Sequence, residues 1–429
     1  MSSRVAMRRA IAALGLCASA ALSTLLAGCG GGGGSGSTNP APAAAASTSV
    51  GSGAAAPAST SGRNVTLAGA MTPASNQVPV TIGPYAAAGR SANLPYVTVT
   101  VCNATGRCVN VDHVVLDTGS YGLRVMAAAV AGLGLSPLPS ASGTLAECAY
   151  FLSGTTWGSV AQATVQMGGE VARKVPIQVI GDSAAGAPPS ACTNHGADQG
   201  SLTGLGGNGL LGVGLRADDV GAGSYFVCSG AACSRSTTPP PQPVANPVWQ
   251  FASDNNGVIV QLPAVGRTGA ATVTGLLTFG IDTEPDNSIA NYALVAADAK
   301  GNFTAKLQGS DYGSSFIDSG SNFTFATLSG PTVDANSMYA PASYTTYPVQ
   351  LKPNVGSGPT VTTEIAAINP SALNFNVDTA FDDVVSPGSA PGANGSVDLG
   401  LNSFYGHASA LLFFGKSCPQ GAGPLYALR

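Results

Sequence analysis

The sequence predicts a mostly β protein made of two related lobes, and three observations support this prediction. First, the 429 residues include 57 glycines but only 17 basic and 21 acidic residues. The charged share of 9% is far below the roughly 25% of an average soluble protein. Second, several short segments alternate apolar and polar residues, as half-buried strands do. Third, one strand-and-turn motif occurs twice, 201 residues apart.

The first 28 residues resemble a bacterial lipoprotein signal peptide. Three arginines precede an apolar segment at 10–25, and Leu26-Ala27-Gly28-Cys29 is similar to the lipobox of such signals. The resemblance implies cleavage before Cys29 and lipidation of this residue. An ordinary secretory signal is the alternative. The apolar segment is shorter than the roughly 20 residues of a transmembrane helix.

Residues 29–63 are interpreted as the lipidated cysteine followed by a tether. From Gly30 to Gly62 the chain is almost entirely Gly, Ser, Ala, Thr and Pro, a composition that cannot bury a core. Because Gly30 rather than an aspartate follows the cysteine, we expect a membrane anchor in the outer membrane, with the body in the periplasm. The folded body is expected at 64–429, as a monomer.

The cysteines of the body suit an exported protein, because the periplasm permits disulfide bonds. Two pairs are close in sequence, Cys102 with Cys108 and Cys228 with Cys233, and each flanks a short turn. Of the other three cysteines, Cys148 with Cys192 is the preferred pair, which leaves one odd thiol. The histidines are few and far apart, so neither a zinc site nor another metal site is expected.

Strands and one short helix are predicted along the body from periodicity and turn residues. The predicted strands are 95–101, 109–116, 160–167, 174–180, 258–262 and 276–281, and the helix is 247–255.

The repeated motif divides the body into a first lobe at 64–285 and a second at 286–429. Val114-Val115-Leu116-Asp117-Thr118-Gly119-Ser120 recurs as Ser315-Phe316-Ile317-Asp318-Ser319-Gly320-Ser321. A Leu-Gly element follows each copy, Leu211-Gly212 in the first and Leu399-Gly400 in the second. A single Asp-Thr-Gly is more often a strand-to-turn junction than a catalytic element. Two copies with the same distal glycine indicate duplicated lobes.

On these residues the chain resembles the pepsin-like aspartic endopeptidases, from about Asn64 to the C-terminus. The two Asp-(Thr/Ser)-Gly-Ser segments resemble the active-site loops of that family. Gly212 and Gly400 resemble the glycines that complete its psi-shaped loops, and 277–282 resembles the strand where its lobes join. The resemblance implies two double-psi β-barrel lobes, a shared sheet, and an active-site cleft that binds an extended peptide or protein substrate.

The chemistry of paired aspartates explains this pattern. Two carboxylates in contact cannot both ionise easily, because like charges destabilise each other. They then share one proton, and the titration belongs to the pair. The ionised partner can take a proton from a bound water, while the neutral one hydrogen-bonds the scissile carbonyl. Asp117 and Asp318 are therefore the predicted catalytic residues, and no cofactor is expected.

The residues around each aspartate have implied supporting roles. Gly119 and Gly320 permit a tight turn and close backbone approach. In the family, the hydroxyl after each aspartate locks the two loops together, here from Thr118 and Ser319. The next hydroxyl supports the outer carboxylate oxygen, here from Ser120 and Ser321.

A flap is predicted in the hairpin at 149–158, where Tyr150 resembles the flap tyrosine of the family. An ordinary exposed aromatic residue is the alternative interpretation of Tyr150. The chain departs from the family at Arg124, which replaces a tryptophan that usually supports the flap, and at Tyr121-Gly122, which replaces a small polar pair.

Other functions agree less well with the sequence. The formal net charge of −4 provides no basic face, so no nucleic-acid partner is expected. The acidic loop at 282–286 suits calcium less well than plain solvation. The main hypothesis is a lipid-anchored aspartic endopeptidase of the cell envelope. The alternatives are a catalytically inactive module of the same fold that binds peptide or glycan, and a structural lipoprotein, because one fold can serve several functions.

Overall fold

The computed structural model describes residues 59–61, 64–89, 91–140, 143–230, 232–388 and 395–429. The predicted signal peptide, Cys29 and most of the predicted tether lie outside the described residues. Within these ranges strands dominate, and the two α-helices have 4 residues each. The prediction of a mostly β protein is therefore confirmed.

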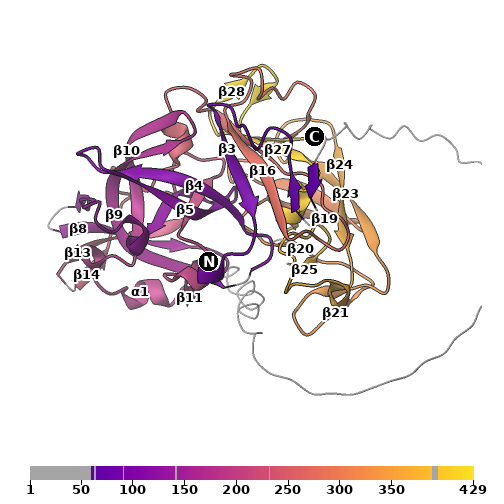
Figure 1. Ribbon diagram of the computed structural model, residues 1–429, viewed down its shortest axis with the longest axis horizontal. Helices are drawn as coiled ribbons and strands as arrows, with labels where there is room; N and C mark the ends of the chain where they lie inside the picture. The colour runs from indigo at the N-terminus through magenta and orange to yellow at the C-terminus, as the bar shows by residue number, and fades with distance from the viewer. Residues whose placement is uncertain (1–58, 62–63, 90, 141–142, 231, 389–394) are drawn as a thin grey trace, which may run out of the picture.

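The strands form two barrel-like groups with a joining sheet between them (Figure 1). The first group contains β4 (Pro95–Cys102), β5 (Cys108–Asp117), β6 (Tyr121–Met126), β8 (Gly143–Tyr150), β9 (Gly154–Met167), β10 (Glu170–Ile180), β12 (Gly209–Val213), β13 (Gly223–Ser229) and β14 (Ala232–Arg235). The second contains β18 (Phe303–Leu307), β19 (Ser310–Ile317), β20 (Thr324–Ala326), β23 (Thr345–Lys352), β24 (Val361–Ala367), β25 (Val385–Pro387) and β26 (Asp398–Leu399).

The joining sheet takes its strands from the beginning, the middle and the end of the body. Its paired order is β17 (Ala293–Ala296), β30 (Leu425–Leu428), β27 (Ala408–Leu412), β15 (Gly257–Gln261), β16 (Thr272–Phe279) and β3 (Gln77–Ile82). In Figure 1, β3, β16 and β27 lie between the two groups. Because the last strands of the chain pair with strands from its middle, this sheet fixes the two lobes against each other.

The remaining elements are short and lie around these sheets. They are β1 (Ser59–Ser61), β2 (Asn64–Thr66), β7 (Pro139–Ser140), β11 (Ala197–Asp198), β21 (Thr332–Val333), β22 (Tyr339–Ala340), β28 (Ser417–Cys418), β29 (Gly421–Ala422), α1 (Ser190–Thr193) and α2 (Leu202–Leu205), with 3-10 turns at 86–88, 127–130, 183–185, 247–250, 370–372 and 401–404. Among the described residues, no helix combines the length and apolar character that crossing a bilayer requires.

Two local expectations differ from the structure. The helix predicted at 247–255 is only the 3-10 turn Pro247–Gln250, because the backbone is already extended at Phe251 and Asp254 has a positive φ of 49°. Strand pairing also begins earlier than expected, since β1, at the end of the predicted tether, pairs with β2 at the start of the predicted body. Backbone hydrogen bonds need no apolar side chains, so composition did not reveal this pairing.

Three disulfide bonds join Cys102 to Cys108, Cys148 to Cys192 and Cys228 to Cys233, which are the three pairs that the sequence favoured. Cys418 is the free thiol among the described cysteines. Two of the bonds close the ends of paired strands, because Cys102 faces Cys108 and Cys228 faces Cys233 in the sheet register. The third fastens α1 to β8.

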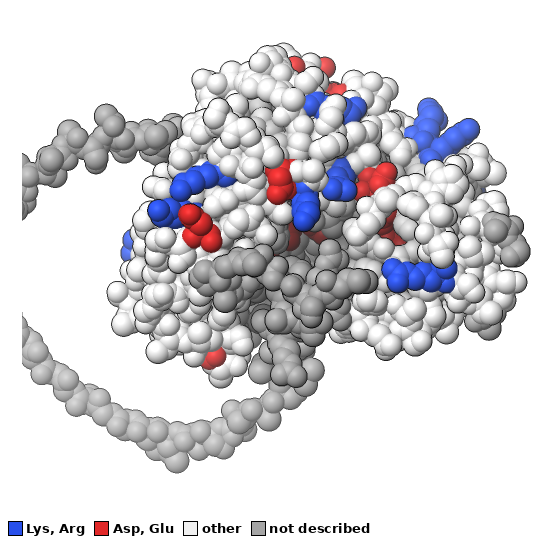
Figure 2. All heavy atoms as spheres, turned by 180° about the vertical axis from the view of Figure 1, so that it is seen from behind, with Lys and Arg blue, Asp and Glu red and all other residues white. Residues whose placement is uncertain are grey.

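The surface reflects the shortage of charge. Figure 2 shows one face on which most visible atoms belong to uncharged residues, while the basic and acidic side chains stand singly or in small groups of both signs. Most acidic side chains on that face lie near basic ones and one stands alone at its lower edge, so the face has no extended region of a single sign.

Candidate active site

The two repeated motifs occupy equivalent places in the two lobes. In the first lobe, β12 runs parallel to β5 and antiparallel to β6. In the second, β26 runs parallel to β19 and antiparallel to β20. The registers agree as well, since Leu211 faces Leu116 and Leu399 faces Ile317. Asp117 therefore ends, and Asp318 follows, a strand that pairs with a short strand from the distal glycine element.

The distal glycines are required by close backbone contacts. A Cβ added to Gly212 would lie 2.7 Å from the backbone of Tyr121, and one added to Gly400 would lie 2.0 Å from the carbonyl oxygen of Phe323. No side chain fits at such distances, so glycine at these positions lets the psi-shaped crossing close.

The carboxyl groups of Asp117 and Asp318 are in hydrogen-bonding contact. The two motif glycines allow this approach. A Cβ on Gly119 would lie 2.5 Å from the carboxyl carbon of Asp318, and a Cβ on Gly320 would lie 2.6 Å from the carboxyl carbon of Asp117. Each glycine thus leaves the space that the aspartate of the opposite lobe occupies. The carboxyl groups are 201 residues apart in the chain and meet only because the lobes pack together.

The aspartates receive different sets of hydrogen bonds. Asp117 accepts three, from the backbone N–H groups of Gly119 at 2.7 Å and Ser120 at 3.0 Å, and from the hydroxyl of Ser120 at 2.6 Å. Asp318 accepts from the N–H of Gly320 at 2.7 Å and from the hydroxyl of Ser321 at 2.9 Å. Asp117 therefore accepts one hydrogen bond more than Asp318 does from the residues of its own loop.

Burial raises the pKa of Asp318 well above its usual range, and the charges of Asp117 and Asp398 raise it further. Both motif aspartates are nearly inaccessible, at 6% for Asp117 and 8% for Asp318. A buried carboxyl group with a raised pKa beside a second carboxyl group is the arrangement in which two acids can share one proton. This protonation pattern can activate a water molecule and polarise a carbonyl group at the same time.

Thr118 and Ser319 link the loops through a reciprocal set of hydrogen bonds. The N–H of Thr118 donates to Ser319 Oγ at 3.1 Å, and the N–H of Ser319 donates to Thr118 Oγ1 at 2.9 Å. The hydroxyls then donate across the lobes, from Ser319 to the carbonyl of Leu116 at 2.8 Å and from Thr118 to that of Ile317 at 3.4 Å. All four bonds join one lobe to the other, so they hold the aspartates in register.

Removing one of these hydroxyls should destabilise the protein measurably. Ser319→Ala leaves the N–H of Thr118 and the carbonyl of Leu116 buried without their partner, which should cost about 1–3 kcal/mol in the free energy of unfolding. Urea denaturation measures this cost. Ser319→Thr, which keeps the hydroxyl, should lose less, and the exposed Ser343→Ala should lose almost nothing. Equal losses for Ser319→Ala and Ser343→Ala would contradict a linking role.

A buried charge cluster beside the first loop was not expected from the sequence. Arg124 reaches Glu147 at 2.7 Å and Asp219 at 2.5 Å, and all three side chains are at most 3% exposed. Tyr225 donates to the second oxygen of Asp219. Burial and then the Glu147 charge raise the pKa of Asp219 well above its usual range, against the opposing effect of Arg124. The chain offers no local signal for this cluster, because its members come from β6, β8 and the segment before β13.

Arg124 also connects the first loop to the hairpin of β8 and β9. Its guanidinium donates to the carbonyl of Tyr121 at 2.7 Å and lies 5.5 Å from the centre of the Phe151 ring. Arg124, which stands where the pepsin-like pattern usually has a tryptophan, therefore still lies against the predicted flap, with a charged side chain in place of an indole.

Tyr150 points to a different part of that hairpin. Its hydroxyl donates to Ser224 Oγ at 2.7 Å, and its ring packs on His195 with the ring centres 4.4 Å apart. Within the described part of the chain, no hydrogen bond joins Tyr150 to Asp117 or Asp318. A flap role for Tyr150 stays a prediction.

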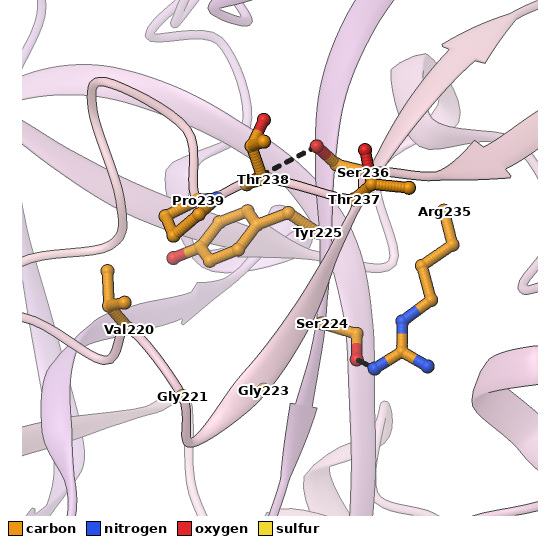
Figure 3. Close-up of a pocket in the computed structure, with 10 residues that line it drawn as sticks. All are labelled: Val220, Gly221, Gly223, Ser224, Tyr225, Arg235, Ser236, Thr237, Thr238 and Pro239. Atoms are coloured by element: carbon orange, nitrogen blue, oxygen red, sulfur yellow. Dashed lines mark hydrogen bonds between the residues drawn. The ribbon is translucent and has the colours of Figure 1, made fainter.

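Two hollows lie near these elements. One of about 190 Å³ is lined by Thr118 and Gly119 together with Lys300, Phe316 and Tyr426. It reaches the first active-site loop. The other, of about 130 Å³, lies beside the predicted flap hairpin, because β13 pairs with β8. Figure 3 shows Tyr225 and Pro239 on one side of it, and Arg235 with its hydrogen bond to Ser224 on the other.

The acidic loop at 282–286 uses its carboxylates within the protein. Asp282 accepts from Ser288 at 2.8 Å, and Asp286 accepts from Asn76 at 3.1 Å and Gln77 at 2.9 Å. In the part of the chain that the structure describes, no three His, Cys, Asp or Glu side chains are grouped so that they could hold a metal ion.

Comparisons with known proteins place the chain in a family. No curated protein sequence matches it significantly. Among solved structures it is similar to an aspartic proteinase from Irpex lacteus, with 15% sequence identity, a TM-score of 0.48, and coverage of 82% of this chain and 96% of that one. A family model described as a protein of unknown function, DUF3443, matches residues 72–428. The chain therefore belongs to the DUF3443 family.

Proposed function

We propose that this protein is an aspartic endopeptidase, in which Asp117 and Asp318 activate a water molecule to hydrolyse a peptide bond. The main support is the direct contact between two carboxyl groups that come from equivalent loops of the two lobes. Such contact is the requirement for sharing one proton. Among the described residues, no Lys or Arg side chain forms an ion pair with either carboxyl group.

The proposed chemistry assigns different roles to the two aspartates. Asp117 accepts three hydrogen bonds and acts as the ionised base that takes a proton from water. Asp318, with its raised pKa, acts as the acid that hydrogen-bonds the scissile carbonyl. No bond forms between enzyme and substrate. The water oxygen bonds to the scissile carbonyl carbon, the C–N bond breaks, and the proton that Asp117 took from the water goes to the leaving amine.

The proposal includes the location of the protein. We propose that Cys29 is lipidated after removal of residues 1–28, and that residues 29–63 tether the body to the outer membrane, where it meets peptide or protein substrates in the periplasm as a monomer. Mass spectrometry of the protein from membranes tests the lipid on Cys29, and Cys29→Ser should release the protein into the soluble fraction.

Substitution of either aspartate should abolish hydrolysis. Asp117→Asn and Asp318→Asn keep the shape of the side chain but prevent proton sharing, and each should lower kcat/KM roughly a thousandfold or more. Cleavage of an unfolded protein between about pH 3 and pH 7 is the assay, with pepstatin as an inhibitor control. Asp311→Asn is the matched control, since Asp311 lies on the same strand β19 with a 59% exposed side chain.

The same assay separates the enzyme from a binding module. If the wild-type protein is as inert as Asp117→Asn at every pH, the protein is no endopeptidase. Binding of unfolded peptides that the substitution leaves intact would then favour the catalytically inactive alternative.

A further inference from the structure

A third carboxyl group lies next to the aspartate pair, on one side only. Asp398 occupies the second lobe where the first lobe has Leu210. The sheet registers establish this equivalence, because Leu210 faces Val115 on the strand that ends at Asp117, and Asp398 faces Phe316 on the strand that ends just before Asp318. An apolar residue in one lobe is thus replaced by an acidic residue in the other.

Asp398 is hydrogen-bonded to the side chain that supports Asp318. Its Oδ2 lies 2.7 Å from Ser321 Oγ, which in turn lies 2.9 Å from Asp318 Oδ2. The residue is fully buried at 0% exposure, and its Oδ1 has no hydrogen-bond partner among the described residues. In the first lobe, the Ser120 hydroxyl donates to Asp117, and among the described residues no second carboxyl group is hydrogen-bonded to it.

The hydroxyl of Ser321 lies between the carboxyl groups of Asp318 and Asp398. It has one hydrogen but is in contact with both groups. It can donate to only one of them, so the other must donate to the serine and must itself be protonated. Asp318 is in contact with Asp117, and its proton is directed there. The proton on Ser321 Oγ is therefore directed to Asp318, and the donor to Ser321 is Asp398.

The surroundings of Asp398 favour the same protonation state. A buried carboxylate with an unpartnered oxygen is costly, whereas a neutral carboxyl group with one unpartnered carbonyl oxygen is much less so. Burial raises the pKa of Asp398 to about 8; the hydrogen bond with Ser321 opposes this shift, and the charge of Asp117 adds to it. The titratable groups that face Asp398 are Asp117, Asp318 and Tyr426, and they include no cation.

We propose that Asp398 is a positioning residue of the aspartate pair, a protonated carboxyl group that donates to Ser321 and thereby directs the Ser321 hydroxyl onto Asp318. Asp398 then donates to Ser321, Ser321 donates to Asp318, and Asp318 donates to Asp117. Asp398 makes no contact with a water or substrate in this role. Its effect on hydrolysis rests on the proposed function, but its protonation does not.

The protonation of Asp398 can be tested without any activity. Its pKa is raised in the folded protein from an unfolded value near 3.8 to about 8. Between these values the folded state holds a proton that the unfolded state has released, so stability falls as the pH rises and levels off above about 8. Asp398→Asn lacks this proton. Relative to the wild type, its unfolding equilibrium constant should fall about tenfold per pH unit between about pH 5 and pH 7.5.

Urea denaturation of both proteins across this range gives the ratio directly. Asp398→Leu serves as a second variant, because leucine already occupies the equivalent position in the first lobe, and it should show the same pH dependence relative to the wild type. A ratio that does not change with pH for either variant would show that Asp398 is ionised when folded, and would overturn the proposal.

The positioning role has a separate kinetic test. The amide of Asp398→Asn can still donate to Ser321, whereas Asp398→Leu cannot. We expect kcat of the leucine variant to be roughly fivefold lower than that of the asparagine variant, which corresponds to the loss of about one neutral hydrogen bond. KM should be equal in the two variants. Equal kcat values would overturn the positioning role. An inert wild-type protein would defeat the proposed hydrolysis, while the stability test would still decide the state of Asp398.

Discussion

Replacing Arg124 with methionine is expected to destabilise the protein by about 3–5 kcal/mol, which is the usual cost of removing one partner from a buried ion pair. Among the residues that the structure describes, Arg124 is the cation that pairs with Glu147 and Asp219, and both carboxylates lie at 0–1% side-chain exposure. Methionine fills much of the same volume without the charge. The free energy of unfolding in urea at pH 7 measures the loss.

The pH dependence of this loss provides a sharper test. Arg124 is the charge that lowers the pKa of Asp219, so without the guanidinium the folded-state pKa of Asp219 rises further above its unfolded value of about 4. Stability then falls as the pH rises from the unfolded value towards the folded one. The difference between the variant and the wild type should therefore be small near pH 4 and large at pH 7. A difference that is constant over this range would mean that lost packing, not lost charge, is the cause.

The Arg124 cluster can also be neutralised as a whole. The triple variant Arg124→Met, Glu147→Gln, Asp219→Asn removes the uncompensated charges and should recover much of the lost stability at pH 7. Arg124→Lys keeps the charge but not the fork that reaches two carboxylates and the Tyr121 carbonyl. Arg124→Lys should therefore be less destabilising than Arg124→Met but more destabilising than the triple variant.

Adding a methyl group at Gly119 or Gly320 should abolish hydrolysis. Each added Cβ would lie 2.5–2.6 Å from the carboxyl carbon of the opposite aspartate, so the carboxyl groups must move apart by several tenths of an ångström or more. Because misplacement of about 1 Å can cost roughly a hundredfold in rate, we expect at least that loss in kcat/KM for Gly119→Ala and Gly320→Ala. Measurement of casein cleavage at acidic pH gives the loss.

The control for these two variants is Gly266→Ala. Gly266 has nothing within 4 Å of an added Cβ and no positive φ, so alanine fits there. It should keep the wild-type kcat/KM. If Gly119→Ala and Gly320→Ala also keep it, close contact of the carboxyl groups is not needed for the reaction, and the proposed mechanism is wrong.

Much of the architecture could be predicted from local patterns. The strand at 109–116 was predicted from alternation and is β5, Cys108–Asp117 in the structure. The equivalence of the lobes followed from two short motifs, and the sheet registers around Leu116 and Ile317 agree with it. The prediction of a helix at 247–255 was wrong, because the pattern of so short a segment does not distinguish a helix from a single turn.

Only part of the candidate site could be predicted from the sequence. The motif residues could be found because they repeat along the chain. Asp398 was overlooked although the two copies of the Leu-Gly element differ at that position, Leu210 against Asp398, and this difference was the available signal. The Arg124 cluster gave no signal, because a single arginine in a strand is usually a solvated residue.

By itself, the sequence determined the strand content, the duplicated motif and the two local cysteine pairs, since each depends on residues a few positions apart. Only the tertiary structure decided which distant groups meet. Thr118 and Ser319 are 201 residues apart, Arg124 and Asp219 are 95 apart, and Ser321 and Asp398 are 77 apart. Protonation of a carboxyl group depends on burial and on neighbouring charges, which packing alone creates. The sequence therefore identifies the types of residue at the site, but their protonation states depend on the tertiary structure.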